Sequence, residues 1–334
     1  HLPCHAHRQE RRGRHHRSQR DPAAAPQVGN QAFFVSLLAI IGISLFIGDG
    51  VITPAISIMS AVEGIHLIPG FEETAQTTLM IIAGIIAISL FSIQSRGTER
   101  VAFAFGPIMV IWFLCLAGFG VISLLAAPGV LLAINPLYAI NYLMAHGIEG
   151  LLILSAVILV ATGSEALYAD MGHLGREPII KAWYLVFIAL SINYLGQGAF
   201  AMTHPEAGNM LFGMVYSIAP VIYIPFLLLS IAATVIASQA MISGIFSIVY
   251  QAINTRILPL HRIEYTSPQL RSQVYVDIMN WLLLAAVLIV ILTFQNSENL
   301  TLAYGLAVCG DMVITGIFIT MIFAYRAEIF KCFF

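Results

Sequence analysis

One apolar segment of the chain carries an acidic side chain followed by two hydroxyl side chains. Asp49, Thr53 and Ser57 are spaced four residues apart, so a helix would place all three on one face. Pro54 has no amide hydrogen and cannot donate to the carbonyl oxygen of Gly50, which leaves that oxygen available. A charge at membrane depth is costly and usually marks an ion or substrate path. The grouping therefore predicts oxygen-based cation coordination inside a membrane.

A second group of polar residues interrupts the apolar segment at residues 147–168. Thr162, Gly163 and Ser164 together weaken helix propensity, and glycine-interrupted spans often unwind where backbone carbonyls bind a cation. Glu165 follows Thr162 by three residues, so a helix would place both side chains on one face. Hard oxygen ligands with no converging His or Cys favour an alkali cation over a transition metal. Residue types alone do not separate potassium from sodium.

Other acidic residues lie within or beside the apolar segments. Glu63 ends the segment that carries Asp49, where it could take up a proton or lie solvated at the membrane interface. A carboxylate in a low-dielectric site can have a raised pKa and could couple proton movement to ion movement. Asp311 could be a second ion ligand or a residue tolerated beside a water-filled cavity, and these alternatives stay open. The role of Asp277 stays open as well.

Polar groups in two further spans are interpreted as structural. The glycines of the segment Asn193–Gly198 favour close helix packing over a role in lining a path. Thr234, Ser238 and Gln239 lie in another apolar span, where we expect them to form hydrogen bonds between helices.

The composition indicates a membrane protein. Of 334 residues, 59% are hydrophobic and 10% are charged, whereas a soluble domain carries about 25% charged residues. A membrane-spanning helix needs about 20 apolar residues. Eight segments qualify, near residues 32–64, 76–94, 104–126, 147–168, 182–202, 218–250, 276–294 and 300–324. Between the third and fourth of these, residues 130–146 are expected to form a short surface helix.

Lys and Arg are confined to every second loop. They precede the first span and follow the second, fourth, sixth and eighth, and they are absent from the loops 65–75, 127–146, 203–217 and 295–299. The positive-inside rule therefore places the N-terminus in the cytoplasm. Residues 1–29 contain no apolar run and are expected to be a disordered basic tail, which could come from another reading frame.

An ordered set of motifs resembles the Kup/HAK/KT family of potassium uptake permeases. The matching stretches lie between about residues 33 and 325 and include Gly48–Ser57, Ser60–Gly64, Glu165–His173, Asn193–Ala199, Ala233–Ala240 and Ala303–Gly305. The resemblance implies an all-α, polytopic membrane protein with the inverted-repeat fold of the amino acid–polyamine–organocation superfamily, a leucine-transporter-like helical bundle. It also implies potassium uptake across the plasma membrane, usually by symport with protons.

The resemblance carries a set of ligands onto this sequence. Asp49, Thr53 and Ser57 match potassium ligands on the third family helix, and Thr162 and Glu165 match ligands on the broken sixth helix. Glu63 matches an acid that matters for transport, which makes it the proton-coupling candidate. We expect potassium ions, protons and membrane lipid as partners and keep a homodimer open. No cofactor and no nucleic acid are expected.

The chain departs from the family pattern at both ends. The eight spans within residues 30–334 correspond to family helices three to ten, so the bundle is expected to be incomplete. Asp277 stands where relatives commonly have Pro, and Asp311 stands where they have a small or hydroxyl residue. We therefore expect a potassium:proton symporter of this family and not an enzyme, since the signature of an intramembrane aspartyl protease fails. An inactive truncated family member is the alternative.

Overall fold

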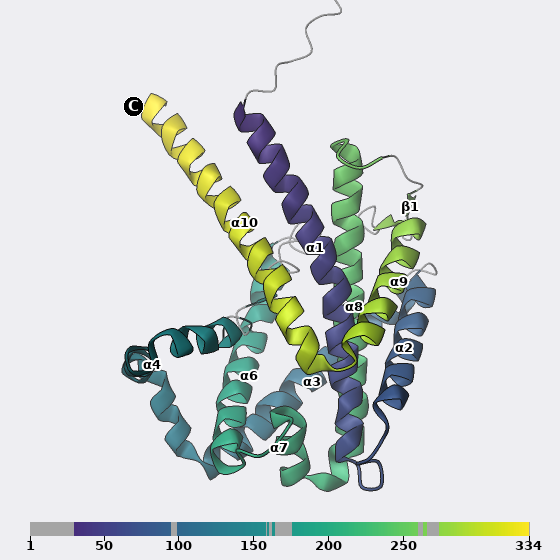
Figure 1. Ribbon diagram of the computed structural model, residues 1–334, viewed down its shortest axis with the longest axis vertical. Helices are drawn as coiled ribbons and strands as arrows, with labels where there is room; N and C mark the ends of the chain where they lie inside the picture. Colours follow the sequence, from purple (N-terminus) through teal and green to yellow (C-terminus); the bar gives the residue numbers. More distant parts are fainter. Residues whose placement is uncertain are drawn as a thin grey trace, which may run out of the picture. The chain divides into compact units, whose positions relative to one another are not determined.

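The computed structural model describes residues 30–94, 99–157, 159, 162–163, 176–259, 263–265 and 274–333 (Figure 1). The chain divides into two compact units, residues 1–39 and residues 40–334. The first unit contributes the beginning of helix α1, and the second contains the rest of the described structure.

The described residues are almost entirely helical, as the apolar segments predicted. The α-helices are α1 (Asn30–Glu63), α2 (Gln76–Ile93), α3 (Glu99–Ala126), α4 (Pro136–Val157), α6 (Arg176–Thr203), α7 (Met210–Ile218), α8 (Tyr223–Asn254), α9 (Asp277–Phe294) and α10 (Ser297–Phe333). Three short 3₁₀ helices are η1 (Gly64–Leu67), η3 (Pro128–Ile134) and η5 (Pro220–Ile222). The two-residue strands β1 (Glu264–Tyr265) and β2 (Val274–Tyr275) pair antiparallel.

Within the described residues, seven helices are long and apolar enough to cross a membrane. They correspond to seven of the eight predicted spans, and the remaining one, residues 147–168, runs over residues that are not described. The bent pair η3 and α4, with an angle of 78° between its halves, would raise the number to eight if it counted as one span. Helix α4 breaks at Gly147, whose φ of 49° suits glycine, and the predicted surface helix ends at the residue before it.

One hydrophobic core joins residues 40–63 of α1 to α2, α8 and α9 (Figure 1). Its fully buried members include Ile58 of α1, Phe91 of α2, Ile245 of α8 and Val287 of α9. These four helices expose other apolar side chains, as expected for helices that face lipid on one side.

Helices α3 and α6 cross at two glycines. A Cβ on Gly196 would overlap the Cα of Gly120 and lie 2.6 Å from its carbonyl oxygen. Ser123 Oγ donates a hydrogen bond of 2.8 Å to the Gly196 carbonyl across the same contact. The segment Asn193–Gly198 therefore serves close helix packing, which confirms the sequence interpretation. A second core, with Phe119 among its buried side chains, joins α3 and α6 to α7 and the start of α8.

Candidate cation site

The predicted acid and hydroxyl pair on α1 forms a direct hydrogen bond. Asp49 is only 4% exposed, and Thr53 Oγ1 donates to its Oδ1 over 2.7 Å. The bond spans one helical turn, as the spacing of four residues predicted. A buried carboxylate needs such donors because an unpartnered charge away from water is very costly. Asp49 has further interactions beyond this bond.

The next turn of α1 continues through a proline. Pro54 is buried inside the helix and cannot donate to the Gly50 carbonyl, as expected. Ser57 follows on the same strip of the helix as Thr53 and is half-buried. Gly50 itself packs against α8: a Cβ at this position would overlap Ile245 Cδ1 and lie 2.8 Å from its Cγ1. A larger residue at this position would require the Ile245 side chain to move.

The predicted unwound segment lacks regular helix where it is described. Thr162 and Gly163 have no helical assignment, and Gly163 has a φ of 99°. Thr162 Oγ1 donates to the Leu159 carbonyl over 2.7 Å, and the hydroxyl of Tyr304 lies 2.9 Å from Thr162 Oγ1. Since the single hydrogen of Thr162 is used, Tyr304 is the donor in the second bond. Glu165 lies outside the described residues.

Helix α10 packs against both segments that carry the predicted ligands. Leu159 lies beside Gly305, where a Cβ would be 3.2 Å from Leu159 Cδ2. On the α1 side, a Cβ on Gly310 would lie 3.0 Å from Leu45 Cδ1. The α10 helix therefore connects the Thr162 segment to α1.

The register between α1 and α10 places Tyr304 near the level of Asp49. A Cβ on Gly42 would lie 4.0 Å from Asp311 Oδ1 and 3.2 Å from Ile314 Cγ2. Together with the Leu45–Gly310 contact, this order shows that the helices run antiparallel. Seven residues, or about two turns, after Gly42 on α1 comes Asp49. Seven residues before Asp311 on α10 comes Tyr304, so the two side chains lie near the same level. Sequence reasoning missed Tyr304 as a site residue, although a polar side chain inside an apolar span was a signal.

Glu63 lies at the end of α1 and contacts the beginning of α10. One carboxylate oxygen accepts from the Ser297 amide over 2.8 Å, and the other accepts from the Ser297 hydroxyl. The first amide hydrogens of a helix have no partner inside the helix, so the carboxylate fills that role. Glu63 is therefore an interhelical cap here, an arrangement that neither sequence alternative had described.

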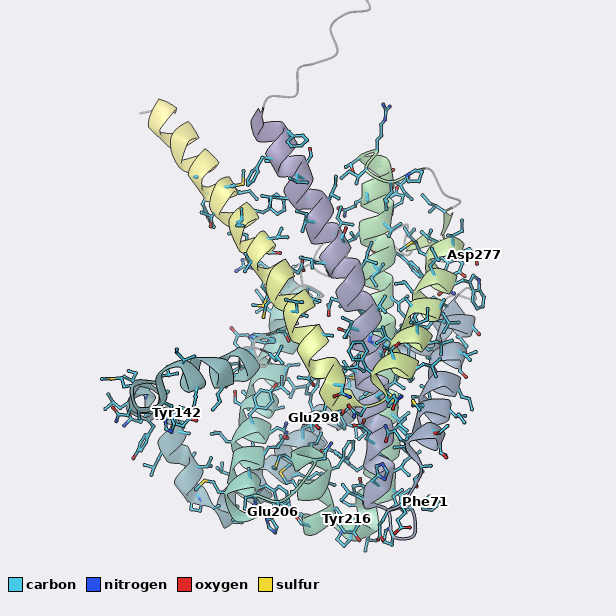
Figure 2. All side chains as sticks on the ribbon, viewed as in Figure 1. Phe71, Tyr142, Glu206, Tyr216, Asp277 and Glu298 are labelled. Atoms are coloured by element: carbon cyan, nitrogen blue, oxygen red, sulfur yellow. The ribbon has the colours of Figure 1, made fainter. Side chains whose placement is uncertain are left out.

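The two aspartates whose roles were open have different surroundings. Asp277 begins α9, where its Oδ1 accepts from the Tyr275 hydroxyl and from Trp281 Nε1, both over 3.0 Å. It lies at the far end of α9 from the α9–α10 turn, where it holds two neighbouring side chains (Figure 2). Asp311 is 7% exposed and faces α1 beside Gly42.

The family described as the K+ potassium transporter integral membrane domain matches residues 10–334. The chain belongs to this family. The match covers both segments that carry the predicted ligands, and it begins inside the basic tail. As a member of a family of membrane transporters, and not of enzymes, the chain is an all-α, multi-pass membrane protein.

Several curated members of this potassium transporter family are similar to the chain over most of its length. The probable potassium transport system protein Kup of Methanosarcina acetivorans is 60% identical over 305 residues, which cover 91% of this chain and 51% of that protein. The Kup protein of Pelobacter propionicus is 60% identical over 303 residues, covering 91% and 50%. Kup 2 of Geobacter sulfurreducens is 59% identical with the same coverage. The chain thus spans about half the length of the curated relatives it matches. No solved structure matches the chain.

In the described ranges, the His, Cys, Asp and Glu side chains form no cluster of three or more that could bind a metal ion.

Proposed function

We propose that this chain carries the potassium site of an uptake permease that moves potassium together with protons across the plasma membrane. The observation that carries the proposal is the buried Asp49 carboxylate, held by Thr53 inside an apolar helix. The names of the relatives, potassium transport system proteins, support potassium as the transported ion.

The proposed ligands are oxygens on two elements, Asp49, Thr53 and Ser57 of α1 with Thr162 and Glu165 of the broken segment. A hydroxyl that donates its hydrogen to a carboxylate still presents lone pairs to a cation. Thr53 can therefore hold Asp49 and bind potassium at the same time. The irregular backbone at Gly163 would add carbonyl oxygens, which replace the water shell of the ion.

Proton coupling is assigned to Glu63, which ends α1 at the predicted outer face. Its two bonds to Ser297 connect α1 to α10 and would be altered by a proton on the carboxylate. The N-terminus and the basic loops are placed in the cytoplasm by the positive-inside rule. Within this proposal, the helices follow the leucine-transporter-like inverted repeat, with lipid around residues 30–334 and the tail, residues 1–29, as a separate basic segment. A homodimer stays open.

Potassium uptake into cells that lack their own potassium uptake systems tests the proposal. We expect Asp49→Asn to abolish uptake in this chain and at the aligned position of the Methanosarcina acetivorans relative, with unchanged membrane expression. Ser44→Ala is the matched control, because Ser44 lies on α1, is exposed and bonds the Ile40 carbonyl of its own helix. Normal uptake by Asp49→Asn would refute the site. Uptake by the relative alone would favour the alternative that this chain is inactive by itself.

A further inference from the structure

A fully buried hydroxyl on α8 has no hydrogen-bond partner among the described residues. Ser238 is 0% exposed, and its Oγ is one of four buried side-chain atoms in the described chain without a partner. The other three are amide oxygens. A buried polar group without a partner costs about 1–3 kcal/mol, so its presence calls for an explanation in function or in a bound ligand. The expected hydrogen bond to another helix is therefore wrong for Ser238, and it is also wrong for Thr234, whose hydroxyl bonds its own helix.

Other hydroxyls on α8 bond to their own helix. Thr234 Oγ1 donates to the Ile231 carbonyl over 2.8 Å, and Ser247 Oγ donates to the Ser243 carbonyl over 3.1 Å. Bonds of this kind to the preceding turn are the usual way in which a hydroxyl is satisfied inside an apolar helix. Ser238 makes no such bond, so its oxygen is not committed to the backbone of α8.

Two contacts with α1 fix which strip of α8 faces that helix. Gly50 of α1 packs against Ile245, and Gly64 of α1 packs against Leu227, whose Cδ1 would lie 2.7 Å from a Cβ there. Between these contacts, steps of three and four residues trace one face of the helix. That face, the α1-facing strip, consists of Leu227, Ile231, Thr234, Ser238, Met241 and Ile245.

The corresponding face of α1 brings a predicted ligand to the same level. Gly50, Ser57 and Gly64 are seven residues apart, so they share one face, and Ser57 lies midway between the two contacts. Because the helices run antiparallel, the midpoint on α8 falls between Thr234 and Ser238. The free oxygen of Ser238 therefore lies near the level of Ser57, which is one turn from Thr53 and two turns from Asp49.

We propose that Ser238 supplies a further oxygen ligand to the potassium ion, from α8, beside Ser57 of α1. The proposal rests on the potassium site proposed above. A potassium ion binds hard oxygens and needs several of them to replace its water shell. A hydroxyl on a third element would complete the shell on the side of the ion that α1 and the Thr162 segment do not reach. The ion would satisfy the oxygen that has no protein partner.

Potassium-dependent thermal stability of the purified 334-residue chain tests this inference. Melting is followed in detergent while potassium chloride replaces choline chloride at constant ionic strength, because a ligand that binds the folded state raises the melting temperature. For Ser238→Ala we expect the potassium concentration at half-maximal stabilisation to rise about tenfold or more. In choline chloride alone its melting temperature should equal or exceed that of the wild type, since an unsatisfied hydroxyl is removed.

Two further variants separate the oxygen from the volume of the side chain. Ser238→Cys keeps nearly the same size but replaces a hard oxygen by sulfur, so it should weaken potassium binding as Ser238→Ala does. Ser247→Ala is the matched control, a buried serine on the same helix that is not part of the α1-facing strip and that donates to the Ser243 carbonyl, and it should keep the wild-type midpoint. A normal response in Ser238→Cys would mean that size and not the oxygen matters, and would overturn the inference.

The inference and the potassium site itself can fail separately. If Ser238→Ala keeps the wild-type midpoint while Asp49→Asn loses the potassium response, the α8 ligand is refuted and the α1 site stands. If the wild-type chain shows no potassium response at all, the site and the α8 ligand are both refuted.

Discussion

Replacement of Thr53 by valine tests whether its hydroxyl holds Asp49, binds the ion, or does both. Valine has the shape of threonine, so the change removes the hydroxyl without opening a cavity. It leaves the 4%-exposed Asp49 carboxylate without the 2.7 Å bond that it now accepts. If Thr53 donates to Asp49 both with and without bound potassium, the bond contributes equally to the two states. It then leaves the potassium affinity unchanged and affects only the free energy of unfolding.

The size of the stability loss follows from the kind of bond. A hydrogen bond to a charged group contributes about 1.5–3 kcal/mol, whereas side-chain bonds measured inside a membrane protein average about 0.6 and reach about 1.7 kcal/mol. Asp49 keeps its other interactions in the variant, so the loss is partial. We therefore expect Thr53→Val to lower the free energy of unfolding by about 1–2 kcal/mol in the absence of potassium.

The assay is denaturation in mixed micelles, with and without potassium, for the wild type, both single variants and the double variant with Asp49→Asn. The coupling free energy of Thr53 and Asp49 should equal most of the single loss, because Asn accepts no charge-assisted bond. Thr53→Ser should restore stability. A weaker potassium response in Thr53→Val beyond this loss identifies Thr53 as a ligand. Unchanged stability, within about 0.5 kcal/mol, would refute the hydrogen-bond reasoning.

Two other predictions concern helix contacts. Gly196→Ala should destabilise the chain by about 1–3 kcal/mol, because its Cβ would meet the Gly120 backbone, which cannot rotate away. Gly84→Ala, whose Cβ would lie 3.6 Å from the nearest side-chain atom, is the control, and equal melting temperatures of the two variants would contradict the prediction. Glu63→Ala and Ser297→Ala should each lower the melting temperature, and the double variant should add little to Glu63→Ala, since both remove contacts of one cap. Additive losses would mean that the two residues act independently.

Local pattern was sufficient to predict the helices of membrane-spanning length and one hydrogen bond within the proposed site. Apolar length predicted seven of the helices that can cross a membrane, because lipid demands about 20 apolar residues whatever the neighbours are. The bond between Asp49 and Thr53 follows from helix geometry alone, since the two residues are one turn apart. The irregular backbone at Gly163 follows from the conformational freedom of glycine.

Contacts between distant parts of the chain were not predictable in this way. Tyr304 bonds Thr162 across 142 residues, and Glu63 bonds Ser297 across 234. Such pairs depend on which helices pack together and in what register, and neither composition nor periodicity contains that information. The lack of a partner for Ser238 was unpredictable for the same reason, because the sequence shows a hydroxyl in a span but not which side chains face it.

The glycines of α1 explain why short side chains can form a site on this helix. Gly42 allows α10 to approach, and Gly50 and Gly64 allow α8 to approach, at positions where a Cβ would meet Ile314, Ile245 and Leu227. Asp, Thr and Ser carry oxygens only one or two bonds beyond Cβ, so helices separated by larger side chains could not bring such oxygens to one ion. In the proposed site, the close contacts would therefore set the distance across which the acid and the hydroxyls of α1 share a cation with α8 and α10. On this reasoning, a larger residue at Gly50 would weaken potassium binding without touching a ligand.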